Sequence, residues 1–239
     1  YDSYACIEEK GMHRAAYRVQ EFLKRAERKW ERPYILKADV KSYFFSIDHD
    51  ILYNIVAAKI ADPKVLWLTK TILDTTESPG IPVGSYTSQW FANLYLHQLD
   101  MFIKHQLRVK MYVRYMDDFV LVLPDKETAR HRQVLGQIRT FLRDNLRLQL
   151  NSKTQIFPVK NGVNFCGYKT WSTHMKVRDA SIRRMKRKLR KFKIKLHNGE
   201  MTGEEFARVL NSWLGYVKKA DSYHLVHKIL RQFDYIYIE

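Results

Sequence analysis

Residues 109–123 constrain the fold more than any other part of the chain. Apolar residues alternate along the first half of this segment, two adjacent acids follow, and residues 119–123 form a continuous apolar run. Alternation followed by a β-branched and aromatic run is typical of two strands joined by a tight turn. The sequence therefore predicts a hairpin with apolar strands and with Asp117 and Asp118 at its tip.

Two interpretations of this acidic pair are open. Asp is common in turns, because its side chain can accept a hydrogen bond from the backbone two residues on. A third acid favours a further role, since Asp39 ends the apolar segment 34–38, which is another predicted strand. Three carboxylates at strand ends repel one another unless a cation neutralises them. Hard oxygen ligands of this kind suit Mg²⁺, and two ions about 3.5–4 Å apart would hold the attacking and leaving oxygens of an in-line phosphoryl transfer.

The charge of the chain points to a polyanionic partner. The 239 residues carry a formal charge of +17, with a pI near 9.8. Segment 176–195 holds eleven Lys or Arg and one acid, Asp179, so it accounts for +10 of the total. Solubility alone would spread the charge, whereas this concentration predicts a face that binds nucleic acid.

The two cysteines, Cys6 and Cys166, have no Cys or His neighbours at metal-ligand spacing. So few cysteines favour a reduced compartment, and we expect a cytoplasmic protein. The absence of an apolar run of transmembrane length predicts that no membrane is bound.

The order of predicted elements, β-α-α-β-β-α-β, indicates an α+β sheet domain of the split βαβ type. Asn161-Gly162 is a hairpin turn signal. Besides the central hairpin, strands are predicted at 34–39, 147–150, 154–159 and 163–168. Helices are predicted at 10–32, after Asp48, from Asp62-Pro63 to Leu73, at 88–107 and after Pro124-Asp125.

The last third of the chain predicts a three-helix bundle. Apolar residues between Ile182 and Leu196 recur at steps of three and four, so one seam of this helix is apolar and the rest is basic. Thr202 and Glu205 have the spacing of a capping box that starts a second helix. A third helix is predicted at 222–233.

Three segments, taken in order, resemble the sequence blocks of a reverse transcriptase. Residues 115–118 (YMDD) resemble the catalytic hairpin, 39–44 (DVKSYF) resemble the block with the first metal-binding aspartate, and 80–89 resemble the block that packs against template and nucleotide. Within that family the chain most resembles the enzymes of diversity-generating retroelements, through 80–100, 163–171 (VNFCGYKTW) and 213–216 (WLGY). Retron, group II intron and phage-defence reverse transcriptases share the catalytic blocks and remain alternatives.

The resemblance implies a right-hand polymerase fold and an RNA-directed DNA polymerase. We expect residues 1–32 to be the end of the fingers with a connecting helix, 33–175 a palm, and 176–239 a basic thumb. Most of the fingers are absent from this sequence, so we expect either that an N-terminal part is not included or that a separate chain supplies them. The implied partners are an RNA template, a DNA or RNA primer and dNTPs, together with a structured partner RNA and a small basic accessory protein.

The resemblance also implies roles for individual residues. Two Mg²⁺ ions, or Mn²⁺ in their place, would bind Asp39, Asp117, Asp118 and the backbone carbonyl of Val40. Phe44 would exclude the 2′-hydroxyl of a ribonucleotide, although a core Phe is the simpler interpretation. The other residues expected at the nucleotide are Val83, Gly84, Gln89 and Lys153, the last as a proton donor to pyrophosphate.

Val83 departs from many polymerases of the family, which carry Gln at this position. An aliphatic residue there is characteristic of the mutagenic retroelement enzymes, and a lost hydrogen bond removes roughly 1 kcal/mol of positional constraint. A conservative loop residue is the alternative interpretation.

The primer grip and the thumb complete the predicted nucleic-acid surface. Gly167, Tyr168 and Trp171 are expected to position the primer end. The thumb residues expected to contact phosphates are Arg183, Arg184, Lys186, Arg187, Lys188, Arg190 and Lys191. A catalytically silent RNA-binding scaffold is the alternative from another class, and retention of all three acids argues against it.

Overall fold

The computed structural model describes residues 2–125 and 129–232. Within these ranges it describes every side chain except those of residues 129–132. Its centre is a four-stranded antiparallel sheet with the order β2-β3-β1-β4. This is the strand order of the split βαβ fold, so the predicted α+β class is confirmed. The strands are β1 (Tyr34–Asp39), β2 (Tyr112–Tyr115), β3 (Asp118–Leu123) and β4 (Gln155–Pro158).

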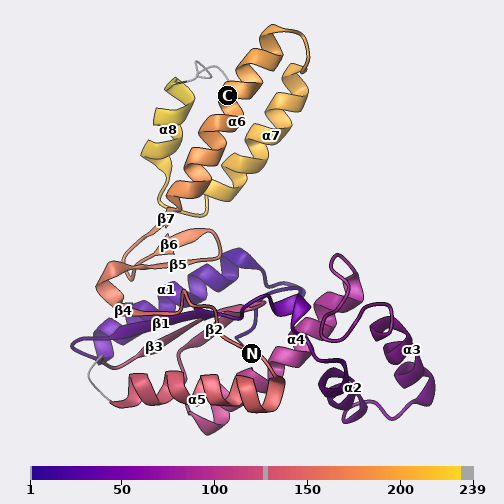
Figure 1. Cartoon of the computed structure of the whole chain (residues 1–239). Helices are drawn as coiled ribbons and strands as arrows, with labels where there is room; N and C mark the ends of the chain where they lie inside the picture. Colours follow the sequence, from indigo (N-terminus) through magenta and orange to yellow (C-terminus); the bar gives the residue numbers. More distant parts are fainter. Residues whose placement is uncertain (1, 126–128, 233–239) are drawn as a thin grey trace.

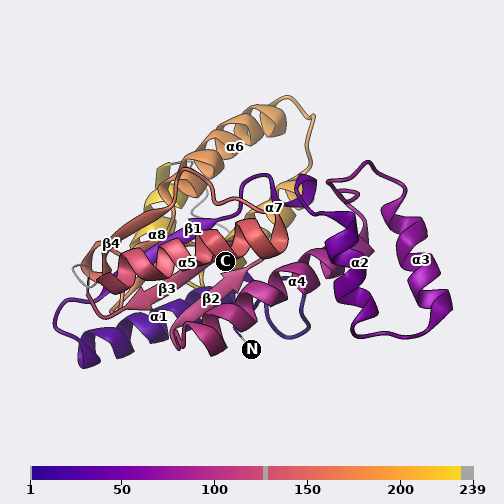
Figure 2. The ribbon, with the colours of Figure 1, turned by 60° about the horizontal axis from the view of Figure 1, so that its bottom comes forward.

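Helices cover both faces of this sheet (Figure 1). Side chains alternate between faces along each strand, so Ile35 and Val120 pack against α1 (Met12–Lys29) while Leu36 and Leu121 face the opposite layer. That layer consists of α4 (Tyr86–Met101) and α5 (Ala129–Leu146), which lie beside one another in Figure 2. The apolar cores on the two faces of the sheet therefore hold the ends of β1 and β3 in fixed register.

Two further helices, α2 (His49–Ala57) and α3 (Pro63–Leu73), extend to one side of the sheet (Figures 1 and 2). Their predicted starts are confirmed, because the Asp48 carboxylate accepts a hydrogen bond from the Ile51 N–H and the Asp62 carboxylate accepts one from the Lys64 N–H. The helix predicted at 88–107 instead begins at Tyr86, and its last turn is π-helical (η2, Phe102–Gln106).

The segment after β4 differs from its prediction. Asn161-Gly162 does not form a hairpin, because β4 remains paired with β1 and the chain leaves through a 3₁₀ turn, η3 (Val159–Asn161). The hairpin turn lies at Cys166-Gly167, where both φ angles are positive, at 47° and 84°. The strand predicted at 147–150 is reduced to one bridge between Leu150 and Val40. The result is a second, three-stranded sheet of β5 (Val163–Phe165), β6 (Tyr168–Thr170) and β7 (Met175–Val177).

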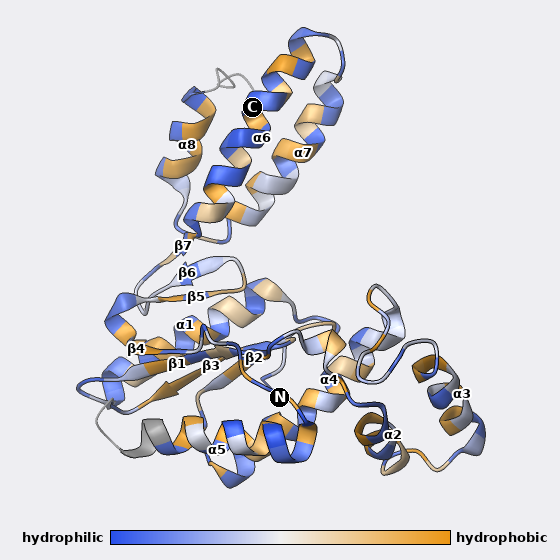
Figure 3. Cartoon of the chain, in the orientation of Figure 1, coloured by the Kyte–Doolittle hydropathy of each residue, from blue (hydrophilic) through white to orange (hydrophobic). Residues whose placement is uncertain are grey.

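The predicted bundle consists of α6 (Asp179–His197), α7 (Gly203–Val217) and α8 (Tyr223–Gln232). It projects beyond the second sheet, and apolar and hydrophilic residues alternate along α6 (Figure 3). The capping box is confirmed by two hydrogen bonds between Thr202 and Glu205, at 3.2 and 3.0 Å. Phe233, the predicted end of α8, lies outside the described residues. No helix of the described residues is both long and apolar enough to span a membrane.

Candidate active site

The tip of the β2–β3 hairpin is a two-residue turn. Tyr115 pairs with Asp118, which leaves Met116 and Asp117 as the connecting residues. Met116 has φ of 55°, in the left-handed region that costs a non-glycine residue about 1–2 kcal/mol. Such a conformation persists only where its surroundings hold it in place.

Strand pairing brings the backbones of the three predicted acids together. Asp39, the last residue of β1, lies opposite Asp118 in the β1–β3 register. One residue on, the Val40 N–H donates a hydrogen bond of 3.2 Å to the Asp117 carbonyl. Asp39 and the hairpin tip, 78 positions apart from Asp39 to Asp117 in the sequence, are therefore neighbours at one end of the sheet.

The side chain of Asp118 is bonded to a lysine. Lys37 Nζ donates to both carboxylate oxygens of Asp118, at 2.8 and 2.9 Å. In the part of the chain that the structure describes, no group of three or more His, Cys, Asp or Glu side chains is arranged to hold a metal ion. Lys37 thus neutralises one of the three acids, and the role of Asp39, Asp117 and Asp118 as metal ligands stays a prediction. Asp39 and Asp117 offer further hard oxygen donors for a divalent cation.

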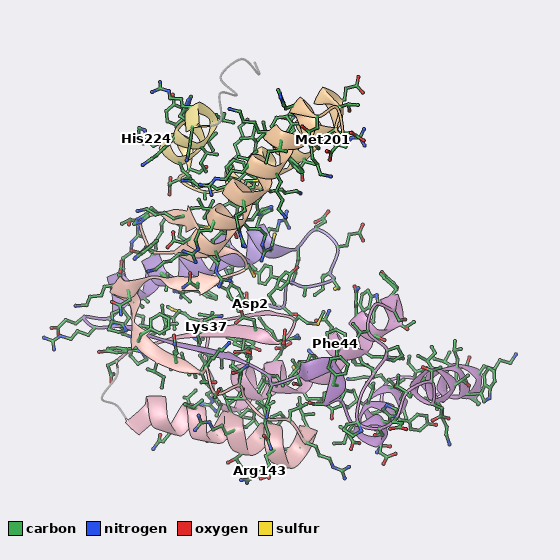
Figure 4. The ribbon with its side chains drawn as sticks, turned by 45° about the horizontal axis from the view of Figure 1, so that its top comes forward. Asp2, Lys37, Phe44, Arg143, Met201 and His224 are labelled. Carbon is green, nitrogen blue, oxygen red and sulfur yellow. The ribbon has the colours of Figure 1, made fainter. Side chains whose placement is uncertain are left out.

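Sequence reasoning missed Lys37, although a signal was present. Lys37 is two residues before Asp39, so the alternation of a strand puts both side chains on one face, together with Asp118 of the paired strand. Figure 4 shows Lys37 within the central sheet.

Burial disfavours charge on the acids of the turn. Burial raises the pKa of Asp117 above the ordinary value, and the nearby Asp39 carboxylate raises it further. A hydrogen bond from the Asp117 backbone and the positive charges of Lys37 and Arg114 oppose this shift. Burial likewise raises the pKa of Asp118, although the Lys37 ammonium opposes the shift. A cation at this position would relieve the repulsion between Asp39 and Asp117.

The residues expected at the nucleotide lie on neighbouring segments. Phe44 belongs to a 3₁₀ turn, η1 (Tyr43–Phe45), and its carbonyl accepts a hydrogen bond of 2.9 Å from the Ile81 N–H. This bond holds the turn against the loop that contains Val83 and Gly84. The Val83 side chain is 66% exposed. Phe44 packs in part against the main core, where the sheet meets α2 (Figure 4).

Gln89 and Lys153 lie in different surroundings. Gln89 is on α4, and its Oε1 accepts a hydrogen bond of 3.0 Å from Cys6 Sγ. Lys153 is exposed beside the strand end, where the Asn151 N–H donates to the Asp39 carbonyl at 2.8 Å. A cavity of about 660 Å³ adjoins Asp39, and its charged lining also includes Lys37, Lys153, Lys169 and Arg178.

The residues expected in the primer grip are used internally. Tyr168 is fully buried, and its hydroxyl donates to the Tyr216 carbonyl and contacts His13 Nδ1, at 2.9 and 2.8 Å. Tyr216 in turn donates to the Gly167 carbonyl at 2.7 Å, and a Cβ at Gly167 would lie 2.5 Å from the Tyr216 hydroxyl. The Tyr168 side chain is therefore packed inside the protein, and its role in positioning the primer end stays a prediction.

Trp171 also packs against its own chain. Its ring stacks on His174 with centroids 4.5 Å apart, and a Cβ at Gly162 would lie 2.5 Å from the ring. The Lys169 and Lys176 ammonium groups lie over the same ring, at 4.9 and 5.7 Å. Trp171 thus packs against His174, Gly162 and two lysines while it stays partly exposed, and its role at the primer end stays a prediction.

The seven basic residues that we expect to contact phosphates lie on α6. All are exposed except Lys186, which is half-buried, and none forms an ion pair within the described ranges. The apolar seam behind them contributes Met185 and Leu189 to a small core with α7 and α8. The seven residues are Arg183, Arg184, Lys186, Arg187, Lys188, Arg190 and Lys191.

Relatives of this chain include a protein encoded by a group II intron. It is 25% identical over 177 residues to protein YkfC of Escherichia coli, covering 57% of this chain and 46% of that protein. It is 26% identical over 132 residues to the group II intron-encoded protein LtrA of Lactococcus lactis, covering 52% and 20% of the two chains. The chain therefore spans less than half the length of these relatives.

The fold is similar to solved telomerase structures of Candida tropicalis. One, in complex with a TWJ fragment of telomeric RNA, matches with a TM-score of 0.59 at 14% identity and covers 97% of this chain and 44% of that one. Apo telomerase truncated from the C-terminal domain matches with a TM-score of 0.58 at 16% identity, covering 74% of this chain and 41% of that one. Residues 1–170 match the family model described as reverse transcriptase (RNA-dependent DNA polymerase). With its paired strand ends, its acidic hairpin tip and this match over most of its length, the chain belongs to the reverse transcriptase family.

Proposed function

We propose that this chain is the catalytic part of an RNA-directed DNA polymerase that extends a primer 3′-hydroxyl on an RNA template. The observation that carries the proposal is the pairing of β1 with β3, which puts Asp39 opposite the end of the hairpin that holds Asp117. Family membership indicates the class of reaction, and the carboxylates indicate where in this chain the reaction would take place.

Asp39 and Asp117 would hold a divalent ion, Mg²⁺ or Mn²⁺, with their carboxylate oxygens. Such an ion stabilises charge on the attacking and leaving oxygens of a phosphoryl transfer. Lys37 keeps Asp118 in place and limits the negative charge of the site. Lys153, Lys169 and Arg178 line the cavity beside Asp39, where they would attract the phosphates of a primer or nucleotide.

The exposed cations of α6 would bind the phosphates of the primer–template duplex. Phosphate contacts depend strongly on salt and carry little sequence preference. A polymerase must accept every template sequence, so this kind of surface suits the proposed reaction.

Primer extension on an RNA template with Mg²⁺ tests the proposal. Wild type is expected to extend the primer with dNTPs, whereas Asp117→Asn is expected to bind the duplex without extending it. Asp62→Asn is a matched control, because Asp62 caps α3 away from the site and Asn is an equally good cap. Equal extension by Asp117→Asn and wild type would refute the site, and duplex binding without any extension by wild type would support an RNA-binding scaffold instead.

We further propose that synthesis is error-prone, as in diversity-generating retroelements. Val83 is largely exposed in the loop anchored to η1, and its side chain offers no hydrogen bond that would fix a nucleotide or template base. Val83→Gln is expected to reduce misincorporation opposite template adenine, measured by sequencing the product. Unchanged misincorporation would remove Val83 from the proposal and leave the polymerase assignment intact.

Phe44 would discriminate against ribonucleotides. Its carbonyl is bonded to Ile81 and its ring packs against Tyr43, so the position of the residue is fixed on two sides. Phe44→Ala is expected to increase ribonucleotide incorporation, in a primer-extension assay that compares rNTPs with dNTPs. Unchanged discrimination would support the interpretation of Phe44 as a core residue.

A further inference from the structure

The largest fully buried side chain of the described residues belongs to Arg114, which lies on β2 just before the catalytic turn. Its guanidinium forms a two-pronged ion pair with Asp100, with Nε donating to Oδ1 at 2.7 Å and Nη2 to Oδ2 at 2.6 Å. Its remaining terminal nitrogen, Nη1, donates to the Met116 carbonyl at 2.9 Å. One buried cation thus connects α4 to the residue that carries the left-handed turn.

Other groups fix the position of this ion pair. The Tyr112 hydroxyl donates to Asp100 Oδ1 at 2.6 Å. Arg114 Nη1 also lies 3.3 Å from Asn93 Oδ1, and Asn93 Nδ2 donates to the Ala5 carbonyl at 2.8 Å. The guanidinium is therefore surrounded by acceptors that are themselves held by α4 and by the first residues of the chain.

The backbone of Arg114 is held as well. Its N–H donates to the Asp2 carbonyl at 2.9 Å, and its carbonyl accepts from the Tyr4 N–H at 3.0 Å. The first residues thus form an outer bridge along β2. Because both backbone and side chain are fixed, Arg114 can impose a single position on the Met116 carbonyl.

A buried ion pair is weak evidence for stability, since apolar residues of similar volume often serve a core equally well. A purely structural Arg–Asp pair also has no need of a third bond to the turn. The guanidinium, in contrast, binds both Asp100 oxygens through two nitrogens and the Met116 carbonyl through the third, and the single nitrogen of a lysine cannot reproduce this planar fork.

We propose that Arg114 is a positioning residue for the polymerase reaction. Its bond to the Met116 carbonyl holds the left-handed turn, and the turn presents Asp117 beside Asp39. The Asp100 carboxylate orients the guanidinium and ties the turn to α4, the helix that also carries Gln89. The catalytic part of this inference rests on the proposed function, while the effect on the turn does not.

The test variant is Arg114→Lys, which keeps the charge and loses the fork. Four measurements are made on the folded protein: Mn²⁺ binding without nucleic acid, the single-turnover extension rate, the dissociation constant for the duplex, and amide hydrogen exchange of residues 115–120 and α5. We expect Mn²⁺ affinity to fall about tenfold and the rate about 100-fold, because small displacements of reacting groups have effects of this size. Exchange at the turn is expected to accelerate while exchange in α5 and the dissociation constant for the duplex stay unchanged.

Arg147→Lys is the matched control. Arg147 also pairs with an aspartate, Asp48, but this pair lies at the start of α2 and makes no bond to the turn. Arg147→Lys is expected to leave all four measurements unchanged. If Arg114→Lys does not fold, Asp100→Asn takes its place, since it keeps the volume of the acid and removes the charge that orients the guanidinium.

The outcomes separate this inference from the proposed function. Wild-type Mn²⁺ affinity and wild-type exchange at the turn, in a variant that only melts at lower temperature, would overturn the positioning role. If Arg114→Lys accelerates exchange at the turn but the wild type extends no primer, the role of Arg114 in the turn is supported and the polymerase proposal is rejected.

Discussion

At the end of the β2–β3 hairpin, charged side chains such as Asp118 and Arg114 are partly or fully buried and bonded to neighbours, whereas most cations of α6 are exposed. Asp118 is bonded to Lys37, and Arg114 to Asp100 and the Met116 carbonyl. On α6, cations such as Arg184 and Arg187 have no ion-pair partner among the described side chains. The first arrangement fixes positions, and the second leaves charge available to a partner.

The difference reflects what each region would have to do. Chemistry depends on groups held in one geometry before the substrate arrives, so their desolvation is offset by fixed partners. Binding to many duplex sequences depends on mobile cations that replace counterions on phosphates. If this comparison is right, substitutions in the two regions have separable effects on rate and on affinity.

The largest expected effect is on the rate. Asp39→Asn is expected to reduce the single-turnover extension rate by about 10³-fold, because removal of one preorganised electrostatic group costs on the order of 10²–10³. Duplex affinity, measured by fluorescence anisotropy, is expected to change little. A large loss of affinity with a normal rate at saturation would break the separation between the two regions.

The next effect concerns the stability of the bundle. Leu189 is fully buried in a core formed with α7 and α8, so Leu189→Ala is expected to destabilise the bundle by about 3 kcal/mol. Hydrogen exchange should accelerate in α6, α7 and α8 and stay unchanged in β1 and β3, which belong to separate cores. Equal acceleration in both regions would show that they unfold as one unit.

A smaller effect is expected from the charge of α6. Replacing Arg184, Arg187 and Lys191 with Gln should weaken duplex binding about tenfold at low salt, and the salt slope should fall by roughly 1 for each phosphate that the variant no longer binds. The rate at saturating duplex should not change. Replacing Lys24, Arg25 and Arg28, three exposed cations of α1, is the matched control. An equal loss of affinity in both variants would mean that net charge alone sets the affinity.

The smallest effect is on the stability of the metal-free protein. The pKa of Asp117 is raised in the folded state, so the group opposes folding increasingly as pH rises from its ordinary pKa to the raised one, and fully above it. Asp117→Asn is expected to stabilise the protein at neutral pH by about 1 kcal/mol, or about 2–4 °C in melting temperature, a small effect because solvent screens a partly exposed group.

This advantage should shrink as pH falls through the raised pKa, where Asp117 becomes neutral in the folded state and the two side chains become equivalent in charge. Thermal melts in EDTA at several pH values measure it. A destabilised Asp117→Asn at neutral pH would contradict the assignment of repulsion between Asp39 and Asp117.

The sequence by itself determined the elements whose signals are local. Alternation and the acidic pair located the central hairpin, Asp48 and Asp62 located two helix starts, and the capping box located α7. These signals act over a few residues, through side-chain periodicity and short-range hydrogen bonds. The approach of Asp39 to the hairpin tip followed as well, because the split βαβ order puts β1 beside β3.

Only the tertiary structure decided how the charged and aromatic groups are paired. Lys37 and Asp118 are 81 positions apart, and Tyr168 and His13 are 155 apart. No local pattern specifies such pairs, so the sequence did not reveal the bond between Asp118 and Lys37 or the burial of Tyr168. Tertiary pairing also decided that the hairpin turn lies at Cys166-Gly167 and not at Asn161-Gly162. Because β4 pairs with β1, β5 pairs with β6 and not with β4. Burial and long-range hydrogen bonds are properties of the packed chain, and they selected which of the acids, lysines and aromatic rings remain free to act.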